Sequence, residues 1–162
     1  MARKRAGGTP ATVVLERARI AFELRPYEHS PGTTSYGEEA AEALGVDPAR
    51  VFKTLLASLD GRLVVGVVPV TGRLDLRALA RVLGGSRAVM ADLGAAERAT
   101  GYVAGGISPL GQRRAHPTVV DATALDHATI LISGGRRGLD LEMAPADLVA
   151  ITGAIVDRVG RA

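Results

Sequence analysis

The spacing of apolar residues changes several times along the chain, and each change predicts a different element of secondary structure. After Asp75, apolar residues recur with the period of one helix face. Residues 22–27 and 139–143 instead alternate apolar and polar side chains, which predicts half-buried strands. The segment from Leu63 to Val70 is almost entirely apolar, so we expect a strand that is buried on both faces.

Capping and turn residues predict where further elements begin. The Thr9-Pro10 pair predicts the start of a helix, because threonine caps helices and proline suits their first turn. Ser35, with Glu38 three residues later, predicts a capping box. The other expected elements are helices over 10–18, 35–44, 92–99 and 145–152, strands over 51–59, 89–90, 118–121 and 129–133, a hairpin turn at 60–61, a turn over 134–138 and a short last strand.

Strands and helices are interleaved along the chain, with at least one hairpin among them. This order predicts an α/β or α+β domain with a mixed sheet, not a purely parallel, doubly wound one. At 162 residues, without an internal repeat or a long linker, the sequence suits one domain with one core. We expect a basic flexible tail over residues 1–8 and a single domain over residues 9–162.

Composition narrows the range of partners and chemistries. The net charge of +3 and the pI near 9.8 are compatible with a polyanionic partner. Hydrophobic residues make up 47% of the chain but aromatic residues only 3%, so the core must be aliphatic. The sequence has no cysteine, which excludes disulfides, thiolate metal sites and a cysteine nucleophile. No apolar run is long enough to cross a bilayer, so a cytoplasmic protein without membrane contact is expected.

Familiar catalytic and cofactor motifs are missing. His29, His116 and His127 do not show the spacing of metal ligands, and each is interpreted as a surface or hydrogen-bonded histidine. No G-x-S-x-G nucleophile elbow, phosphate-binding P-loop or dinucleotide fingerprint is present. We therefore expect neither a metal nor a cofactor.

The segment from Thr100 to Gly111 contains four glycines and one proline but no charged residue. Glycine allows positive φ angles and lets other groups approach the backbone closely. One interpretation is a shaped loop whose N–H groups bind a carbonyl or phosphate oxygen. The other is an ordinary connecting loop.

Lys53 stands out because 18 of the 20 basic residues are arginine. It lies in a predicted strand, either facing outward or aiming its ammonium group into a pocket. An ammonium group is compact and changes its pKa readily on burial, unlike a guanidinium. Asp140 could be its partner, an acceptor for a ligand amine, or a solvated strand residue. Ser133, between Ile132 and Gly134, is similarly ambiguous.

Two arginine pairs, Arg113-Arg114 and Arg136-Arg137, adjoin the glycine-rich segments. Arginine binds phosphate through two parallel hydrogen bonds. If the two loops are neighbours, four guanidinium groups would surround one pocket mouth; otherwise they are solvated loop charges. The sequence has few aromatic residues, so a surface that reads RNA bases by stacking is not expected.

Several short segments between Thr9 and about Leu148 carry a resemblance when they are taken together. They are Thr9-Pro10-Ala11, Tyr27-Glu28-His29, Val51 to Leu56, Leu74-Asp75-Leu76, Met90-Ala91-Asp92, Thr100-Gly101-Tyr102, Gly105 to Gly111, and Ser133 to Leu139. In identity and order, they resemble the YbaK family of bacterial Cys-tRNA(Pro) deacylases, part of the trans-editing superfamily related to the prolyl-tRNA synthetase insertion domain. The resemblance implies a mixed, partly barrel-like β-sheet packed with helices.

The resemblance implies an aminoacyl-tRNA deacylase that removes cysteine from Cys-tRNA(Pro), with Cys-tRNA(Cys) as a second candidate substrate. In the family, the substrate's own thiol is thought to attack the ester carbonyl, assisted by backbone groups of the glycine-rich loop. Lys53 matches the essential strand lysine, and Gly105 matches the key loop position. The residues implied to bind substrate are Tyr27, Tyr36, Thr54, Gly106, Ile107, Ser108, Pro109, Ser133 and Asp140.

One residue departs from the family pattern, and two other functions are alternatives to the deacylation of cysteinyl-tRNA. The family often has phenylalanine where Tyr36 precedes Gly37, so a hydroxyl is added to the pocket wall. The first alternative is a sister deacylase for alanine or another small amino acid, and the second is a tRNA-binding or synthetase-associated module without catalysis. The implied partners are the acceptor end of tRNA(Pro) and, as a candidate, prolyl-tRNA synthetase, but not DNA.

Overall fold

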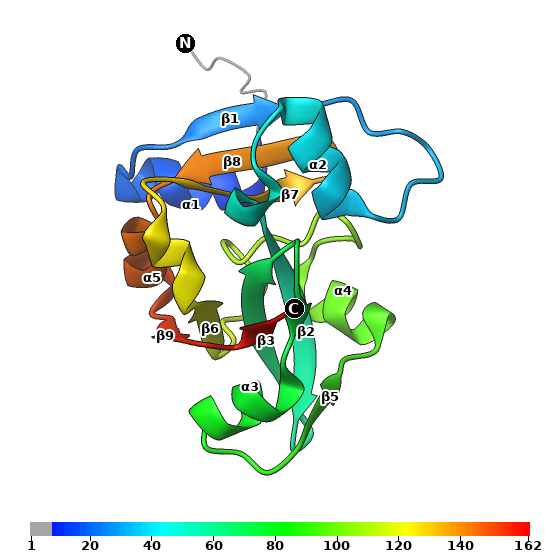
Figure 1. Cartoon of the computed structure of the whole chain (residues 1–162), viewed down its shortest axis with the longest axis vertical. Coiled ribbons are helices and arrows are strands. Elements are labelled where there is room, and N and C mark those ends of the chain that lie inside the picture. Colours follow the sequence, from blue (N-terminus) through cyan, green and yellow to red (C-terminus); the bar gives the residue numbers. More distant parts are fainter. Residues whose placement is uncertain (1–7) are drawn as a thin grey trace.

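The computed structural model describes residues 8–162, which form two main sheets with helices around them (Figure 1). The predicted tail, residues 1–8, lies outside the described part of the chain except for Gly8. Between residues 8 and 162, no helix is both long enough and apolar enough to cross a membrane. The predicted mixed organisation of helices and strands is confirmed.

The larger sheet has five strands in the order β5 (Ala88–Met90), β2 (Phe52–Leu59), β3 (Arg62–Pro69), β6 (Thr118–Asp121) and β9 (Ile155–Asp157). β5, β2 and β3 pair antiparallel, whereas β3, β6 and β9 pair in parallel. The predicted hairpin joins β2 to β3 at Asp60-Gly61, where both residues have positive φ. Val64, Val65, Val67 and Val68 of β3 are all fully buried, which confirms the prediction of burial on both faces.

The second sheet is antiparallel, with strands in the order β1 (Glu23–Pro26), β8 (Leu139–Met143) and β7 (Ile130–Arg136). β1 is an edge strand, consistent with its proline. The turn predicted over 134–138 is shorter than expected, because β7 continues to Arg136 through an irregularity in pairing between Ser133 and Arg136. A separate pair consists of β4 (Arg73–Leu74) and β10 (Gly160–Arg161).

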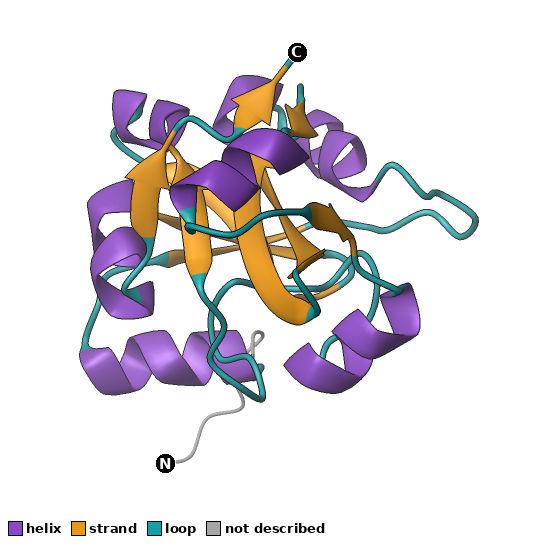
Figure 2. Ribbon diagram, turned by 90° about the horizontal axis from the view of Figure 1, so that it is seen from below, coloured by secondary structure: helices purple, strands orange, loops and turns teal. Residues whose placement is uncertain are grey.

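The two main sheets meet just before β2. An isolated parallel bridge joins Val51 to Leu131 of β7, and side chains from both sheets share one aliphatic core. Figure 2 shows the helices arranged around the outside of the strands. The strands of residues 8–162 do not close into a barrel, so the partly barrel-like sheet implied by the resemblance is two sheets in contact.

Most helices begin and end at the expected residues. Thr9 accepts a hydrogen bond from the Thr12 N–H, and Asp75 and Asp92 cap their helices in the same way. The α-helices are α1 (Pro10–Ala18), α2 (Tyr36–Leu44), α3 (Leu76–Val82), α4 (Leu93–Thr100) and α5 (Pro145–Thr152), and the 3₁₀ helices are Pro48–Arg50 and Ala122–Asp126.

The capping box predicted for α2 is wrong. Ser35 precedes the helix, but its side chain makes no capping hydrogen bond. Its backbone, with φ −91° and ψ 68°, is outside the extended conformation typical of a capping residue. Glu38 instead lines a pocket, as described below.

Asp121, at the end of β6, fixes the C-terminal segment through its buried carboxylate. It accepts hydrogen bonds from the N–H groups of Val159 (2.8 Å) and Gly160 (2.7 Å) and from the Thr123 hydroxyl (2.5 Å). Burial acts to raise the pKa of Asp121, but these hydrogen bonds outweigh it and leave the pKa lowered. A carboxylate of this kind stabilises the fold above its unfolded-state pKa, and the stabilisation is lost as the pH falls through the folded-state pKa.

We predict that Asp121→Asn lowers the free energy of unfolding near pH 7 by about 1–3 kcal/mol, because an amide cannot accept all of these hydrogen bonds. Urea unfolding near pH 7 and near pH 3 measures the effect, and the difference from wild type should shrink at the acidic pH. Asp126→Asn, at an exposed position of the same region, is the matched control. Equal stability of Asp121→Asn and wild type at neutral pH would contradict the assignment.

Candidate active site

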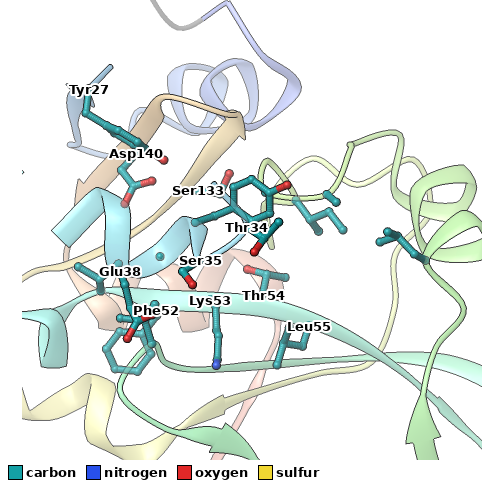
Figure 3. Close-up of a pocket in the computed structure, with 18 residues that line it drawn as sticks. Tyr27, Thr34, Ser35, Glu38, Phe52, Lys53, Thr54, Leu55, Ser133 and Asp140 are labelled. Carbon is teal, nitrogen blue, oxygen red and sulfur yellow. The ribbon is translucent and has the colours of Figure 1, made fainter. Parts of the chain in front are cut away.

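A pocket of about 390 Å³ is lined by residues from both main sheets, from α2 and α4, and from the glycine-rich loop (Figure 3). Most residues singled out from the sequence meet here. The lining residues are Tyr27, Thr34, Ser35, Tyr36, Gly37, Glu38, Val51, Phe52, Lys53, Thr54, Leu55, Val70, Leu93, Ala104, Gly105, Ile107, Ser133 and Asp140.

The pocket follows the part of β2 that has a neighbouring strand on one side only. β3 pairs with the whole of β2, but β5 pairs only with Ala57–Leu59. The bridge to β7 is at Val51, before β2 begins. One edge of the segment 52–55 is therefore left without a partner strand, and all four of its residues line the pocket.

The backbone of Thr54 points toward this open edge. In an antiparallel pair, only alternate residues bond to the partner strand. The backbone of Leu56 forms its hydrogen bond on the side away from β3, because its C=O accepts from the Ala91 N–H at 3.1 Å. Its β3 neighbour Val65 also bonds elsewhere, to the Pro117 C=O at 2.8 Å. Thr54 precedes Leu56 by two residues, so its N–H and C=O point away from β3 as well.

The side chain of Thr54 adds a third polar group. Its Oγ1 is buried and has no hydrogen-bond partner within residues 8–162. A buried polar group without a partner costs roughly 1–3 kcal/mol, so proteins seldom keep one without a use for it. A molecule bound at the open edge could form hydrogen bonds with all three groups of Thr54.

Lys53 supplies an ammonium group on the other side of β2. Figure 3 shows its side chain pointing away from Ser133 and Asp140. Lys53 is half-buried, and burial lowers its pKa, while the charge of Glu38 raises it and that of Arg73 lowers it. Asp140 is therefore not the partner of Lys53, because the two side chains lie at different ends of the pocket. The charged groups that act on Lys53 are Glu38 and Arg73.

Asp140, Ser133 and Tyr27 form the opposite end of the pocket. Ser133 and Asp140 face each other across the β7–β8 pair. Asp140 is only 6% exposed, and burial raises its pKa to about 7, although the charge of Arg25 opposes the rise. Burial also raises the pKa of Tyr27 to about 12, and the Asp140 charge adds to the effect. Near neutral pH, this carboxyl group can either donate or accept a proton.

Gly105 occupies a position that other residues could not fill without displacement. Its φ is +83°, and a Cβ atom there would lie 2.5 Å from Cδ1 of the Tyr36 ring. The N–H groups of Gly105 and Ile107 donate no hydrogen bond in the described part of the chain, whereas the Gly106 N–H bonds to the Val103 C=O at 2.8 Å. Both residues line the pocket, so their unpaired amides are candidate donors to an oxygen atom bound there.

The glycine-rich loop is held in place from several directions. The Tyr102 hydroxyl donates to the Leu110 C=O at 2.6 Å, which closes the loop on itself. The Ala104 N–H donates to Glu97 of α4 at 2.8 Å. Arg137 donates from Nε to the Ala104 C=O at 2.7 Å, and its guanidinium carbon lies 5.3 Å from the centre of the Tyr36 ring. These contacts favour the interpretation of a shaped loop over that of an ordinary connector.

Three of the residues predicted to bind substrate do not line the pocket. Gly106 packs against β7, where a Cβ atom would lie 2.8 Å from Cα of Arg136. Ser108 is fully buried, and its hydroxyl accepts from the Leu110 N–H at 3.2 Å. Pro109 is also buried. These residues shape the loop from behind.

None of the four predicted arginines is among the pocket-lining residues. Arg137 binds the loop at the pocket rim, and Arg113 donates to the Arg98 C=O at 3.1 Å. Arg114 is exposed, and the backbone of Arg136 packs on Gly106. The guanidinium group of Arg137 thus holds loop backbone, and that of Arg113 holds a carbonyl group of α4.

Sequence reasoning missed several lining residues, notably Glu38, Val70 and Leu93. Glu38 could have been found from its place in the first turn of α2 beside Tyr36, but in the sequence the same position also fits a capping box. Val70 and Leu93 come from segments that only the fold brings together.

The pocket supplies groups that can bind and polarise a substrate. It offers an ammonium group, a carboxyl group, hydroxyl groups and free backbone amides, and neither histidine nor cysteine lines it. Across residues 8–162, no group of three or more histidine, cysteine, aspartate or glutamate residues could hold a metal ion. Such a site suits a reactant that brings its own nucleophile or uses water.

The chain is similar in sequence to known proteins. A family model described as "Aminoacyl-tRNA editing domain" matches residues 29–151. The chain is 34% identical over 146 residues to EbsC of Enterococcus faecalis, covering 89% of this chain and 88% of that protein. EbsC is named, provisionally, a Cys-tRNA(Pro)/Cys-tRNA(Cys) deacylase.

Solved structures share the fold over nearly the whole chain. The crystal structure of a hypothetical protein matches with a TM-score of 0.85 at 26% identity, covering 94% of this chain and 99% of that one. Another, described provisionally as a trans-editing enzyme for prolyl tRNA synthetase, matches with a TM-score of 0.83 at 23% identity, covering 99% and 100%.

The raised pKa of Asp140 predicts a dependence of stability on pH opposite in sign to that of Asp121. Between the ordinary aspartate pKa and a value of about 7, the folded chain holds a proton that the unfolded chain releases. The contribution of Asp140 to the free energy of unfolding should therefore decrease as the pH rises through this window. Asp140→Asn should remove that decrease, as measured by urea unfolding at about pH 5 and about pH 8. An unchanged pH dependence in the variant would contradict the assignment.

Proposed function

Because the chain belongs to the aminoacyl-tRNA editing domain family, we propose that it is a trans-editing deacylase that releases cysteine from Cys-tRNA(Pro), and from Cys-tRNA(Cys) by the same chemistry. The observation that carries the proposal is the combination of Lys53, the unpaired Thr54 hydroxyl and the free amides of Gly105 and Ile107 around one pocket. EbsC, which is 34% identical to this chain, is named as a deacylase of cysteinyl-tRNAs, and this supports cysteine as the amino acid that is released.

The reaction needs no nucleophile from the protein. The substrate sulfur forms a bond to its own ester carbonyl carbon, and the bond from that carbon to the ribose oxygen breaks. The thiol proton ends on the ribose oxygen, and the product is a cyclic thiolactone that water then opens to cysteine. The protein's part is to fold the substrate into the reactive geometry and to stabilise the negative charge that develops on the carbonyl oxygen.

The amides of Gly105 and Ile107 are the proposed donors to that oxygen. Their loop is fixed by Tyr102, Glu97 and Arg137, so the donors are oriented before the substrate arrives. Preorganised donors are effective because they need not reorient as charge develops. Loss of one such donor typically costs ~2.7–4 kcal/mol of transition-state stabilisation.

The two ends of the pocket suggest how the substrate lies. The α-amino group of the cysteine suits the end with Asp140, whose buried carboxyl group can accept its hydrogen bonds. The ribose and terminal phosphate of the tRNA suit the end with Lys53, the half-buried ammonium group. This orientation places the ester at Thr54, between the two ends.

The requirement for the substrate's thiol would provide the selectivity. A pocket alone separates amino acids that differ by one methylene by only ~1–3 kcal/mol. Proline and alanine have no thiol, so they would be spared because they cannot react, even if they bind. The acceptor end of tRNA(Pro) is the proposed nucleic-acid partner, and prolyl-tRNA synthetase is the candidate protein partner.

We predict that the purified protein releases cysteine from Cys-tRNA(Pro) in a panel of mischarged tRNAs. Lys53→Ala should lower kcat/KM by roughly 10–100-fold, the equivalent of one hydrogen bond between charged groups of about 1.5–3 kcal/mol. Arg158→Ala, which removes an exposed charge elsewhere, is the control and should retain the wild-type rate. An unchanged rate in Lys53→Ala would remove the lysine from the mechanism.

The same panel separates the proposal from its alternatives. S-methylcysteinyl-tRNA(Pro) should resist cleavage, because its sulfur cannot lose a proton. Cleavage of this substrate or of Ala-tRNA(Pro) at the rate of Cys-tRNA(Pro) would indicate attack by water and a sister deacylase. Binding of tRNA without cleavage of any substrate would indicate a module without catalysis.

A further inference from the structure

A second hollow of the molecule is a groove between α3 and the segment that leads into β5. Three arginines line it, Arg77, Arg81 and Arg87, together with the backbone of Gly84 to Ser86. No acidic residue is among its lining residues. Within residues 8–162, none of the three guanidinium groups forms a salt bridge or a side-chain hydrogen bond.

Within residues 8–162, no carboxylate forms a salt bridge with the guanidinium groups of this arginine groove. Arg77 and Arg81 are four residues apart on α3, so they are neighbours on one helix face and repel each other. Two aspartates lie nearby, but both are committed to backbone groups. Asp60 binds the N–H groups of Ser86 (2.8 Å) and Arg87 (2.9 Å), and Asp75 caps α3 through the Ala78 N–H at 3.1 Å.

The frame that carries these charges is fixed. Gly85 packs so closely on Leu59 that a Cβ atom would lie 2.5 Å from its Cδ1. The Asp60 N–H donates to the Arg87 C=O at 2.9 Å, so Asp60 holds this segment through three hydrogen bonds in all. The three guanidinium groups therefore extend from an anchored helix and an anchored turn.

The arginine groove and the pocket lie at opposite ends of one strand. Lys53 of β2 lines the pocket, whereas Leu59 of β2 pairs with Ala88, which lines the groove. Six residues of extended strand separate Lys53 from Leu59, a distance of about 20 Å at ~3.3 Å per residue. Figure 1 shows β2 running from the region of α2 to that of α3 and β5.

We propose that the arginine groove binds the phosphodiester backbone of the tRNA acceptor stem while the aminoacylated end occupies the pocket. This inference rests on the proposed function. Three guanidinium groups from two neighbouring elements suit successive phosphates of a nucleic-acid backbone, because each can bind one phosphate group. In the described part of the chain, the groove arginines also have no side-chain hydrogen bond, whereas Arg113 and Arg137 donate to backbone carbonyl groups.

Binding of an uncharged acceptor-stem RNA microhelix over a series of KCl concentrations tests the groove. Each phosphate contact adds about 0.7–0.9 to the slope of log K against log salt. We expect Arg77→Gln/Arg81→Gln to reduce that slope by about 1–2 and to weaken binding at low salt. Arg17→Gln/Arg158→Gln removes the same charge from exposed positions elsewhere and should leave the slope near wild type. Arg77→Lys/Arg81→Lys should retain most of it.

A cleavage assay separates this inference from the proposed function. The groove variant should show a raised KM and an unchanged kcat on Cys-tRNA(Pro), but wild-type rates on a short cysteinylated CCA oligonucleotide that cannot reach the groove. Equal salt slopes for the groove variant, its control and the wild type would overturn the groove assignment, whether or not cleavage occurs. Failure of the wild type to cleave either substrate would overturn the proposed function instead, and the microhelix measurement would still decide the groove.

Discussion

The unequal pairing of the two edges of β2 is the constraint on which the pocket depends. β3 covers one edge of β2 throughout, but β5 covers the other edge only from Ala57 onward. The sheets touch again at the Val51–Leu131 bridge, so the uncovered segment is short and closed at both ends. An uncovered strand edge inside a fold presents backbone groups without partners, and here they face a pocket in place of solvent.

Successive side chains of β2 point to opposite faces of the strand, so they bring their functional groups to different parts of the pocket. Lys53 and Thr54 are neighbours in sequence, so they point to opposite faces and serve different parts of the pocket. The glycine-rich loop completes the site only because Gly105 lacks a side chain and can lie against the Tyr36 ring. The active-site proposal therefore requires both devices: an open strand edge and a loop that approaches it without a Cβ atom.

Much of the fold could be predicted from local patterns. The helix from Pro10, the buried strand β3 and the hairpin at Asp60-Gly61 each follow from residues close in sequence. The capping box predicted for α2 failed because both of its residues take part in the pocket instead. Ser35 and Glu38 fit a capping box in sequence, but the backbone before α2 bends toward the pocket, and Glu38 acts on Lys53.

The site was predictable as a set of residues but not as an arrangement. The resemblance supplied Lys53, Thr54 and Gly105, which all line the pocket. It could not show that Asp140 and Lys53 occupy different ends, because strand pairing and side-chain direction decide that. The arginine groove was missed because Arg77, Arg81 and Arg87 are unremarkable in a chain with 18 arginines until α3 and β5 are placed side by side.

The central claim is that the substrate ester lies at the open edge of β2, and Thr54→Val tests it most directly. The two side chains have nearly the same shape, and Oγ1 has no partner within residues 8–162, so the free energy of unfolding should stay the same or rise. The Thr54→Val variant should also have a lower kcat/KM for Cys-tRNA(Pro) than the wild type, by about tenfold. This corresponds to the loss of one hydrogen bond of ~1.4 kcal/mol between Thr54 and the substrate. Wild-type cleavage by a stable Thr54→Val protein would contradict the account.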